Sequence, residues 1–140
     1  MREAHPHLES VEHERRIRVV LAARDRRFLR VTSFLLARDG FLVDSTRKLE
    51  DLPEIVQRHR PDVVILDGMD SLTMTARAIA GLEALPYSVA VLVVAEAPEA
   101  SSPRSVRLLH KWTSFDRLVH EVERLSGDAP GKGEVSPGLA

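Results

Sequence analysis

The stretch Asp62-Val63-Val64-Ile65-Leu66-Asp67 decides the fold. Four successive apolar residues between polar ends are typical of a strand that is covered on both faces, as in a parallel sheet. Asp67 stands at the carboxyl end of this strand. In open α/β sheets, ligands and reactive groups lie in the crevice outside the carboxyl ends of the strands. Because a buried carboxylate is costly without a cation or a hydrogen-bond donor beside it, Asp67 is the first candidate for a functional residue.

Strand and helix patterns alternate on both sides of this stretch. Short apolar runs predict strands over residues 17–22, 41–43, 63–66, 89–94 and 105–109. Apolar residues at helical spacing predict helices from 28 to Gly40, from 49 to 59, from 72 to near Pro86, and from 115 to 125 with Thr113 or Ser114 as the N-cap. This regular alternation predicts a doubly wound parallel sheet.

The composition of the chain excludes several classes of function. The 140 residues carry a net charge of −1, which gives no general attraction to nucleic acid or membranes. The absence of cysteine excludes disulfides, thiolate metal sites and cysteine nucleophiles. We find no membrane-spanning apolar run and no signal peptide, and therefore expect a cytoplasmic protein. A glycine-rich phosphate loop, a Ser-His-Asp order and an HExxH helix are all missing, so we do not expect an enzyme.

The two ends of the chain differ in composition from its middle. Residues 1–15 are polar and are predicted to form a flexible N-terminal arm, in which the three histidines His5, His7 and His13 do not have the spacing of a metal site. Residues 127–140 are rich in glycine and proline and are predicted to be a disordered tail. The globular domain is expected over residues 16–126.

Three segments of this domain carry a resemblance in one register. They are Ala37-Arg38-Asp39-Gly40-Phe41, the segment Arg60 to Asp67, and Lys111, which Leu118 follows seven residues later. Together they resemble the CheY-like receiver domain of bacterial response regulators. The resemblance implies a flavodoxin-like fold with five parallel strands in the order 2-1-3-4-5 and about five helices. The short, proline-containing stretch between Ala95 and Lys111 predicts a shortened fourth helix.

The resemblance also implies phosphorylation of an aspartate, but the sequence lacks several residues that this reaction requires. Receivers accept a phosphoryl group on the aspartate that matches Asp67, with Mg²⁺ held by two acidic residues at the end of the first strand. Those two positions are Ala23 and Arg24 here, with Asp25 following, and the hydroxyl that contacts the phosphoryl group is replaced by Ala95. Alanine cannot bind a metal, and arginine brings a fixed positive charge.

These departures lead to specific expectations for the site. We expect Arg24 and Lys111 to hold Asp67 as a buried, ionised carboxylate; a solvent-exposed Arg24 is the alternative. Asp25 is expected to be a helix N-cap, and Asp25 and Asp67 are weak candidates for a metal site. No cofactor is expected, and Mg²⁺ would be needed only if Asp67 is phosphorylated.

The favoured function is that of a degenerate, stand-alone receiver, or pseudo-receiver, which acts in signal transduction by contact with a protein partner and without phosphorylation. One alternative is a phosphorylated single-domain response regulator of a two-component phosphorelay that uses Asp67. Another is a nucleic-acid-binding accessory protein that uses the cluster of seven arginines between Arg15 and Arg30. Contact with nucleic acid is not favoured, and a homodimer stays open. Trp112, where the family usually has proline, is interpreted as an anchor for a partner or a cover for the sheet edge.

Overall fold

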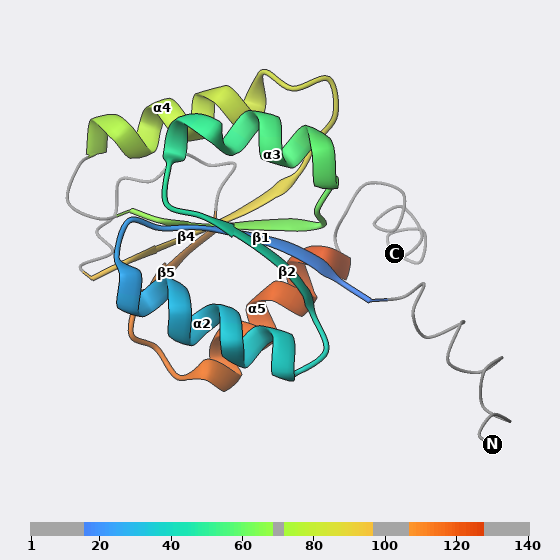
Figure 1. The fold of residues 1–140 in the computed structure, drawn as a ribbon, viewed down its shortest axis with the longest axis vertical. Coiled ribbons are helices and arrows are strands. Elements are labelled where there is room, and N and C mark those ends of the chain that lie inside the picture. The colour runs from blue at the N-terminus through green and yellow to red at the C-terminus, as the bar shows by residue number, and fades with distance from the viewer. Residues whose placement is uncertain (1–15, 69–71, 97–106, 128–140) are drawn as a thin grey trace, which may run out of the picture.

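The computed structural model describes residues 16–68, 72–96 and 107–127 (Figure 1). Their helices and strands, in chain order, are β1 (Arg18–Ala22), α2 (Arg26–Arg38), β2 (Leu42–Thr46), the 3-10 turn η1 (Leu49–Asp51), α3 (Leu52–His59), β3 (Val63–Asp67), α4 (Leu72–Glu83), β4 (Ala90–Ala95), β5 (Arg107–His110) and α5 (Phe115–Gly127). The strands form one parallel sheet in the order β2-β1-β3-β4-β5. The predicted fold class and strand order are confirmed.

Two layers of helices cover the sheet, α2 and α5 on one face and α3 and α4 on the other (Figure 1). Successive residues of β1 point to opposite faces, so Val19 packs with Phe28 and Leu36 of α2, and Val20 packs with Leu52 of α3. Every residue of β3 is buried, as a central strand with helices on both faces requires.

Two predicted boundaries are corrected. The second strand was expected at 41–43 but runs from Leu42 to Thr46, because its length is set by parallel pairing with all of β1, from Arg18 opposite Leu42 to Ala22 opposite Thr46. The last helix extends to Gly127, one residue beyond the predicted domain end. Its N-cap is Ser114, whose Oγ accepts a hydrogen bond from the backbone N–H of Arg117 at 3.2 Å.

Some expectations concern other parts of the chain. The predicted arm at 1–15, the shortened fourth helix, the beginning of the fifth strand and the tail from 128 onward lie outside the described residues. Across the described ranges, each helix is too short or too polar to cross a membrane.

Strand β5, which leads to Lys111, is fixed to α5 by a buried carboxylate. Glu121 of α5 accepts two hydrogen bonds from the guanidinium of Arg107, at 3.2 and 3.3 Å, and one from Arg124 at 3.2 Å. Burial alone would raise the pKa of Glu121, but the two arginines outweigh it and hold the pKa below its ordinary value. The edge strand is therefore held in register with the helix that covers it.

Candidate functional site

The carboxyl ends of the strands converge on one crevice. Ala23 follows β1, Asp67 ends β3, Ala95 ends β4, and Lys111 follows β5. The backbone N–H of Lys111 donates to the carbonyl of Ala95 at 2.8 Å, which draws the lysine to the end of β4. The sequence predicted this convergence, since parallel strands present their carboxyl ends at one edge of the sheet.

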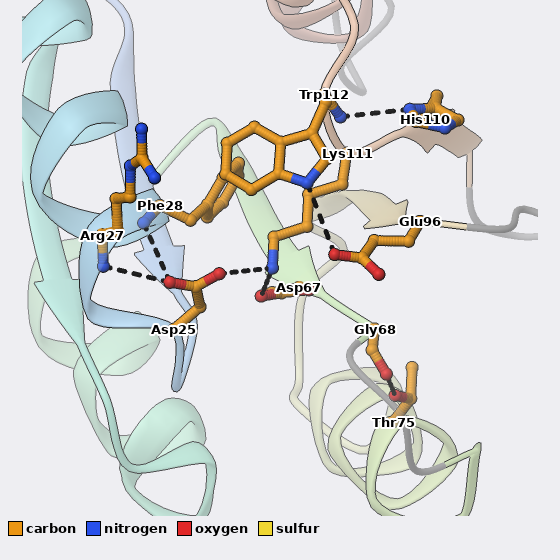
Figure 2. Close-up of polar contacts among 10 residues, drawn as sticks. All are labelled: Asp25, Arg27, Phe28, Asp67, Gly68, Thr75, Glu96, His110, Lys111 and Trp112. Atoms are coloured by element: carbon orange, nitrogen blue, oxygen red, sulfur yellow. Dashed lines mark hydrogen bonds and ion pairs between the residues drawn. The ribbon is translucent and has the colours of Figure 1, made fainter.

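A single ammonium group joins two carboxylates at the centre of the crevice. Lys111 Nζ lies 3.0 Å from Asp67 Oδ2 and 2.8 Å from Asp25 Oδ2 (Figure 2). Asp67 is fully buried and Lys111 is only 8% exposed. Burial alone would lower the pKa of Lys111, but the hydrogen bonds to Asp25 and Asp67 raise it above its ordinary value. Lys111 is therefore a fixed cation, which compensates the buried charge of Asp67.

Asp25 has two tasks in this arrangement. As predicted, it is the N-cap of α2: its Oδ1 accepts hydrogen bonds from the backbone N–H groups of Arg27 at 3.0 Å and Phe28 at 3.2 Å. Its other oxygen binds Lys111. The Lys111 hydrogen bond, followed by that of the Phe28 N–H, lowers the pKa of Asp25 below its ordinary value. Asp25 thus connects the start of α2 to the lysine after β5.

The prediction that Arg24 helps to hold Asp67 is wrong, and the alternative of an exposed side chain is confirmed. Arg24 is exposed, and its Nη1 donates a long hydrogen bond of 3.7 Å to the sulfur of Met74 in α4. The reason is local. Because Asp25 must face the first turn of α2 to cap it, the loop directs Asp25 into the crevice and leaves Arg24 toward α4. Asp67 therefore pairs with Lys111 and not with Arg24. The second charged residue bound to Lys111 is Asp25, which directly follows Arg24.

Two aromatic rings lie against the lysine. Lys111 Nζ is 5.2 Å from the ring centroid of Phe28 and 5.3 Å from that of Trp112. The two rings meet edge to face, with centroids 5.8 Å apart. The indole Nε1 of Trp112 donates to Glu96 Oε2 at 3.4 Å, across the end of β4 (Figure 2). Trp112 therefore covers the lysine and still leaves 52% of its surface exposed.

Sequence reasoning identified Asp67, Asp25 and Lys111 but missed Phe28 and Glu96 as parts of this site. The helical spacing of apolar residues in the first helix indicated only that Phe28 faces the core. The tryptophan directly after Lys111 was the one available signal, because a large exposed ring needs a neighbouring surface to pack on.

The turn after Asp67 is held by a buried hydroxyl. Thr75 of α4 donates from Oγ1 to the carbonyl of Gly68 at 3.0 Å, and the N–H of Gly68 donates to the carbonyl of Val94 at 2.7 Å. A side chain at position 68 would meet that same carbonyl at 3.3 Å, tighter than most contacts of a Cβ. Glycine therefore lets the chain pass close to β4 directly after Asp67.

The crevice does not fit Mg²⁺. This ion requires hard oxygen ligands, usually one or two carboxylates with waters around them. Ala23 supplies no ligand atom, and both nearby carboxylates, Asp25 and Asp67, bind the ammonium of Lys111. Within the described ranges, no group of three or more histidine, aspartate or glutamate side chains is arranged to hold a metal ion. A divalent cation would therefore have to compete with Lys111 for these two carboxylates.

No protein-family model matches this chain, and no curated protein matches it. Solved structures do. A signal receiver domain from Vibrio parahaemolyticus has a TM-score of 0.71 at 16% identity and covers 86% of this chain and 97% of its own. A sensor protein from Polaromonas sp. JS666 has a TM-score of 0.70 at 20% identity, covering 81% and 98%. The activated receiver domain of RstA from Klebsiella pneumoniae has a TM-score of 0.61 at 16% identity, covering 78% and 97%. The chain has the fold of a response-regulator receiver domain.

Proposed function

We propose that this chain is a receiver-like signalling module that acts by contact with a partner protein, without phosphorylation of Asp67. The observation that carries the proposal is the position of Lys111, whose ammonium is bound by both Asp67 and Asp25. In an active phosphoryl-transfer site, catalysis depends almost entirely on positioned charges that neutralise the transferring group. Here the positioned cation, Lys111, is already paired with two carboxylates of the protein.

The side chains around the lysine support the same proposal. The positions where receivers place metal-binding acids and a hydroxyl hold Ala23, Arg24 and Ala95. Asp67 has no exposed surface, and Trp112 and Phe28 pack beside its lysine partner. An incoming phosphoryl donor would bring more negative charge to a buried site whose cation, Lys111, is already paired with two carboxylates, which is costly without the metal ion.

A role in signalling is supported by the fold neighbours. They include the receiver domain of a hybrid histidine kinase, CckA, and the receiver domain of a Francisella response regulator. If Asp67 is not phosphorylated, the domain can still act by binding a partner protein through its surface. The proposed partner is therefore a protein of a signalling or regulatory pathway.

Incubation with acetyl phosphate or phosphoramidate in the presence of Mg²⁺, followed by intact mass spectrometry, tests the proposal. Wild type is expected to stay unmodified. The matched positive control is the variant with Ala23→Asp, Arg24→Asp and Ala95→Thr, which restores the receiver pattern and should gain a phosphoryl adduct. A wild-type adduct that disappears in Asp67→Asn would overturn the proposal and establish a phosphorylated single-domain response regulator.

A further inference from the structure

The solvent side of α2 has a charge pattern that its own stability does not explain. The helix carries four arginines and no acidic residue. The amino end of a helix is electrostatically positive and favours acidic side chains, yet Arg26 and Arg27 occupy it. Arg26 and Arg30 are four residues apart, which places two like charges side by side. Local rules of this kind are commonly broken where a surface serves another purpose.

The same side of α2 exposes large apolar side chains. Phe34 is 62% exposed and Val31 is 46% exposed. Together with Trp112 they are the exposed large hydrophobic residues of the described part of the chain. Residues three apart in a helix are neighbours on its surface, so Val31 and Phe34 form one apolar patch. Arginines flank that patch along the helix, at positions 27, 30 and 38.

The arginines near this patch lack acidic partners in the described structure. The ion pairs of the described residues involve Arg58, His59, Arg107, Lys111 and Arg124. Arg26 and Arg30 are not among them; instead they line a groove of about 450 Å³ together with Leu29, Ser33 and Ser45. Ser45 belongs to β2, the edge strand of the sheet, so this groove lies between α2 and that edge strand.

We propose that this surface, formed by Arg26, Arg30, Val31, Phe34 and the adjoining groove, binds an acidic amphipathic helix of a partner protein. Carboxylates of the partner would pair with Arg26 and Arg30, and its apolar side chains would cover Phe34 and Val31. Exposed aromatic residues flanked by arginines are the residue types that dominate binding energy at protein interfaces. The inference deepens the proposed function, on which it rests, by naming the contact surface and the chemistry of the partner.

Charge argues against a second copy of the chain as the occupant. In a two-fold dimer built on this face, the arginines of one copy would meet those of the other, and juxtaposed like charges disfavour binding. Duplex DNA would satisfy the arginines but would leave the apolar patch of Val31 and Phe34 unpartnered. The acidic amphipathic helix satisfies both features.

The test uses the full chain and a fluorescently labelled synthetic helical peptide, with glutamates on one side and leucines on the other, at physiological salt. Fluorescence anisotropy is expected to show saturable binding. Arg30→Glu and Phe34→Ala should each weaken it about tenfold or more, as hot-spot residues do. Arg77→Glu, the same charge reversal on an exposed residue of α4, should leave it unchanged. Peptides with lysine for glutamate, or serine for leucine, should not bind.

Several results would overturn this inference. The first is peptide binding that neither Arg30→Glu nor Phe34→Ala weakens. The second is a dimer, seen in sedimentation, that Phe34→Ala abolishes. The third is binding of duplex DNA that displaces the peptide and is lost in Arg30→Glu. The phosphodonor assay keeps the two proposals apart. If the peptide does not bind and Asp67 stays unmodified, only the proposed binding surface is refuted. If the peptide binds but Asp67 becomes phosphorylated, only the proposal that the chain acts without phosphorylation is refuted.

Discussion

Replacement of Lys111 by methionine is the perturbation that addresses the crevice most sharply. Methionine keeps an unbranched, flexible stem next to Phe28 and Trp112 but removes the charge. The variant leaves Asp67, which has no exposed surface, without the ammonium that lies 3.0 Å from it. Asp25 also loses its lysine partner, but its side chain is 34% exposed and water can replace part of that interaction.

The expected magnitude follows from the burial of Asp67. Coulomb attraction across 3.0 Å amounts to about 5 kcal/mol at an effective dielectric constant of about 20. Removal of one partner from a buried ion pair generally costs about 3–5 kcal/mol, because the other charge stays buried. We therefore expect Lys111→Met to lower the free energy of unfolding by about 3–5 kcal/mol, a large share of the roughly 5–15 kcal/mol typical of a domain.

Urea denaturation of wild type, Lys111→Met, Asp67→Asn and the double variant measures this effect. The double variant should be more stable than the sum of the two single losses predicts, because it no longer buries an uncompensated carboxylate. A loss below about 1 kcal/mol in Lys111→Met, or strictly additive losses in the double variant, would refute the assignment of Lys111 as the counterion of Asp67.

Further predictions concern the residues around the lysine. Arg24→Ala should change the free energy of unfolding by less than about 0.5 kcal/mol, since Arg24 is exposed; a clear loss in urea denaturation would return Arg24 to the site. Millimolar Mg²⁺ should raise the Tm of Lys111→Met but not of wild type, because only the variant frees the carboxylates of Asp25 and Asp67; equal shifts would contradict this. The pKa of Asp25 is lowered below 3.8 by Lys111, so its stabilisation is present above the unfolded pKa and is lost as pH falls through the folded pKa. Asp25→Asn should therefore flatten the decline of Tm below about pH 4, and an unchanged pH profile would speak against the pair.

Much of the fold could be predicted from sequence because the sheet is parallel and covered on both sides. Such strands need continuous apolar runs, and Val63 to Leu66 shows one without ambiguity. Strand β2 was less predictable. It lies at the sheet edge and contains Asp44, Ser45 and Thr46, so its extent comes from pairing with β1 rather than from its own hydrophobicity.

The site was predictable in its positions but not in the direction of its side chains. Strand order placed Asp67 and Lys111 in one crevice, and the structure brings them together. The sequence predicted Asp25 as the N-cap of α2. It did not predict that the second carboxylate oxygen of this cap would bind Lys111, because a helix cap position does not fix where the free oxygen points. Trp112 was noticed in the sequence, but its partner Glu96 follows a different strand and carried no signal of its own.

The proposed function requires that Asp67 does not accept a phosphoryl group. Ala23, Arg24 and Ala95 replace the metal-binding acids and the hydroxyl, and Lys111 is bound between Asp67 and Asp25. Beryllofluoride with Mg²⁺ tests this requirement most directly, since this phosphoryl mimic needs no chemical step to occupy a competent site. The measurement is a titration of the full chain followed by backbone amide resonances of Gly68, Val94 and Lys111. These resonances are expected to stay unchanged at millimolar beryllofluoride and Mg²⁺. A new, saturable set of resonances that is absent in Asp67→Asn would contradict this expectation.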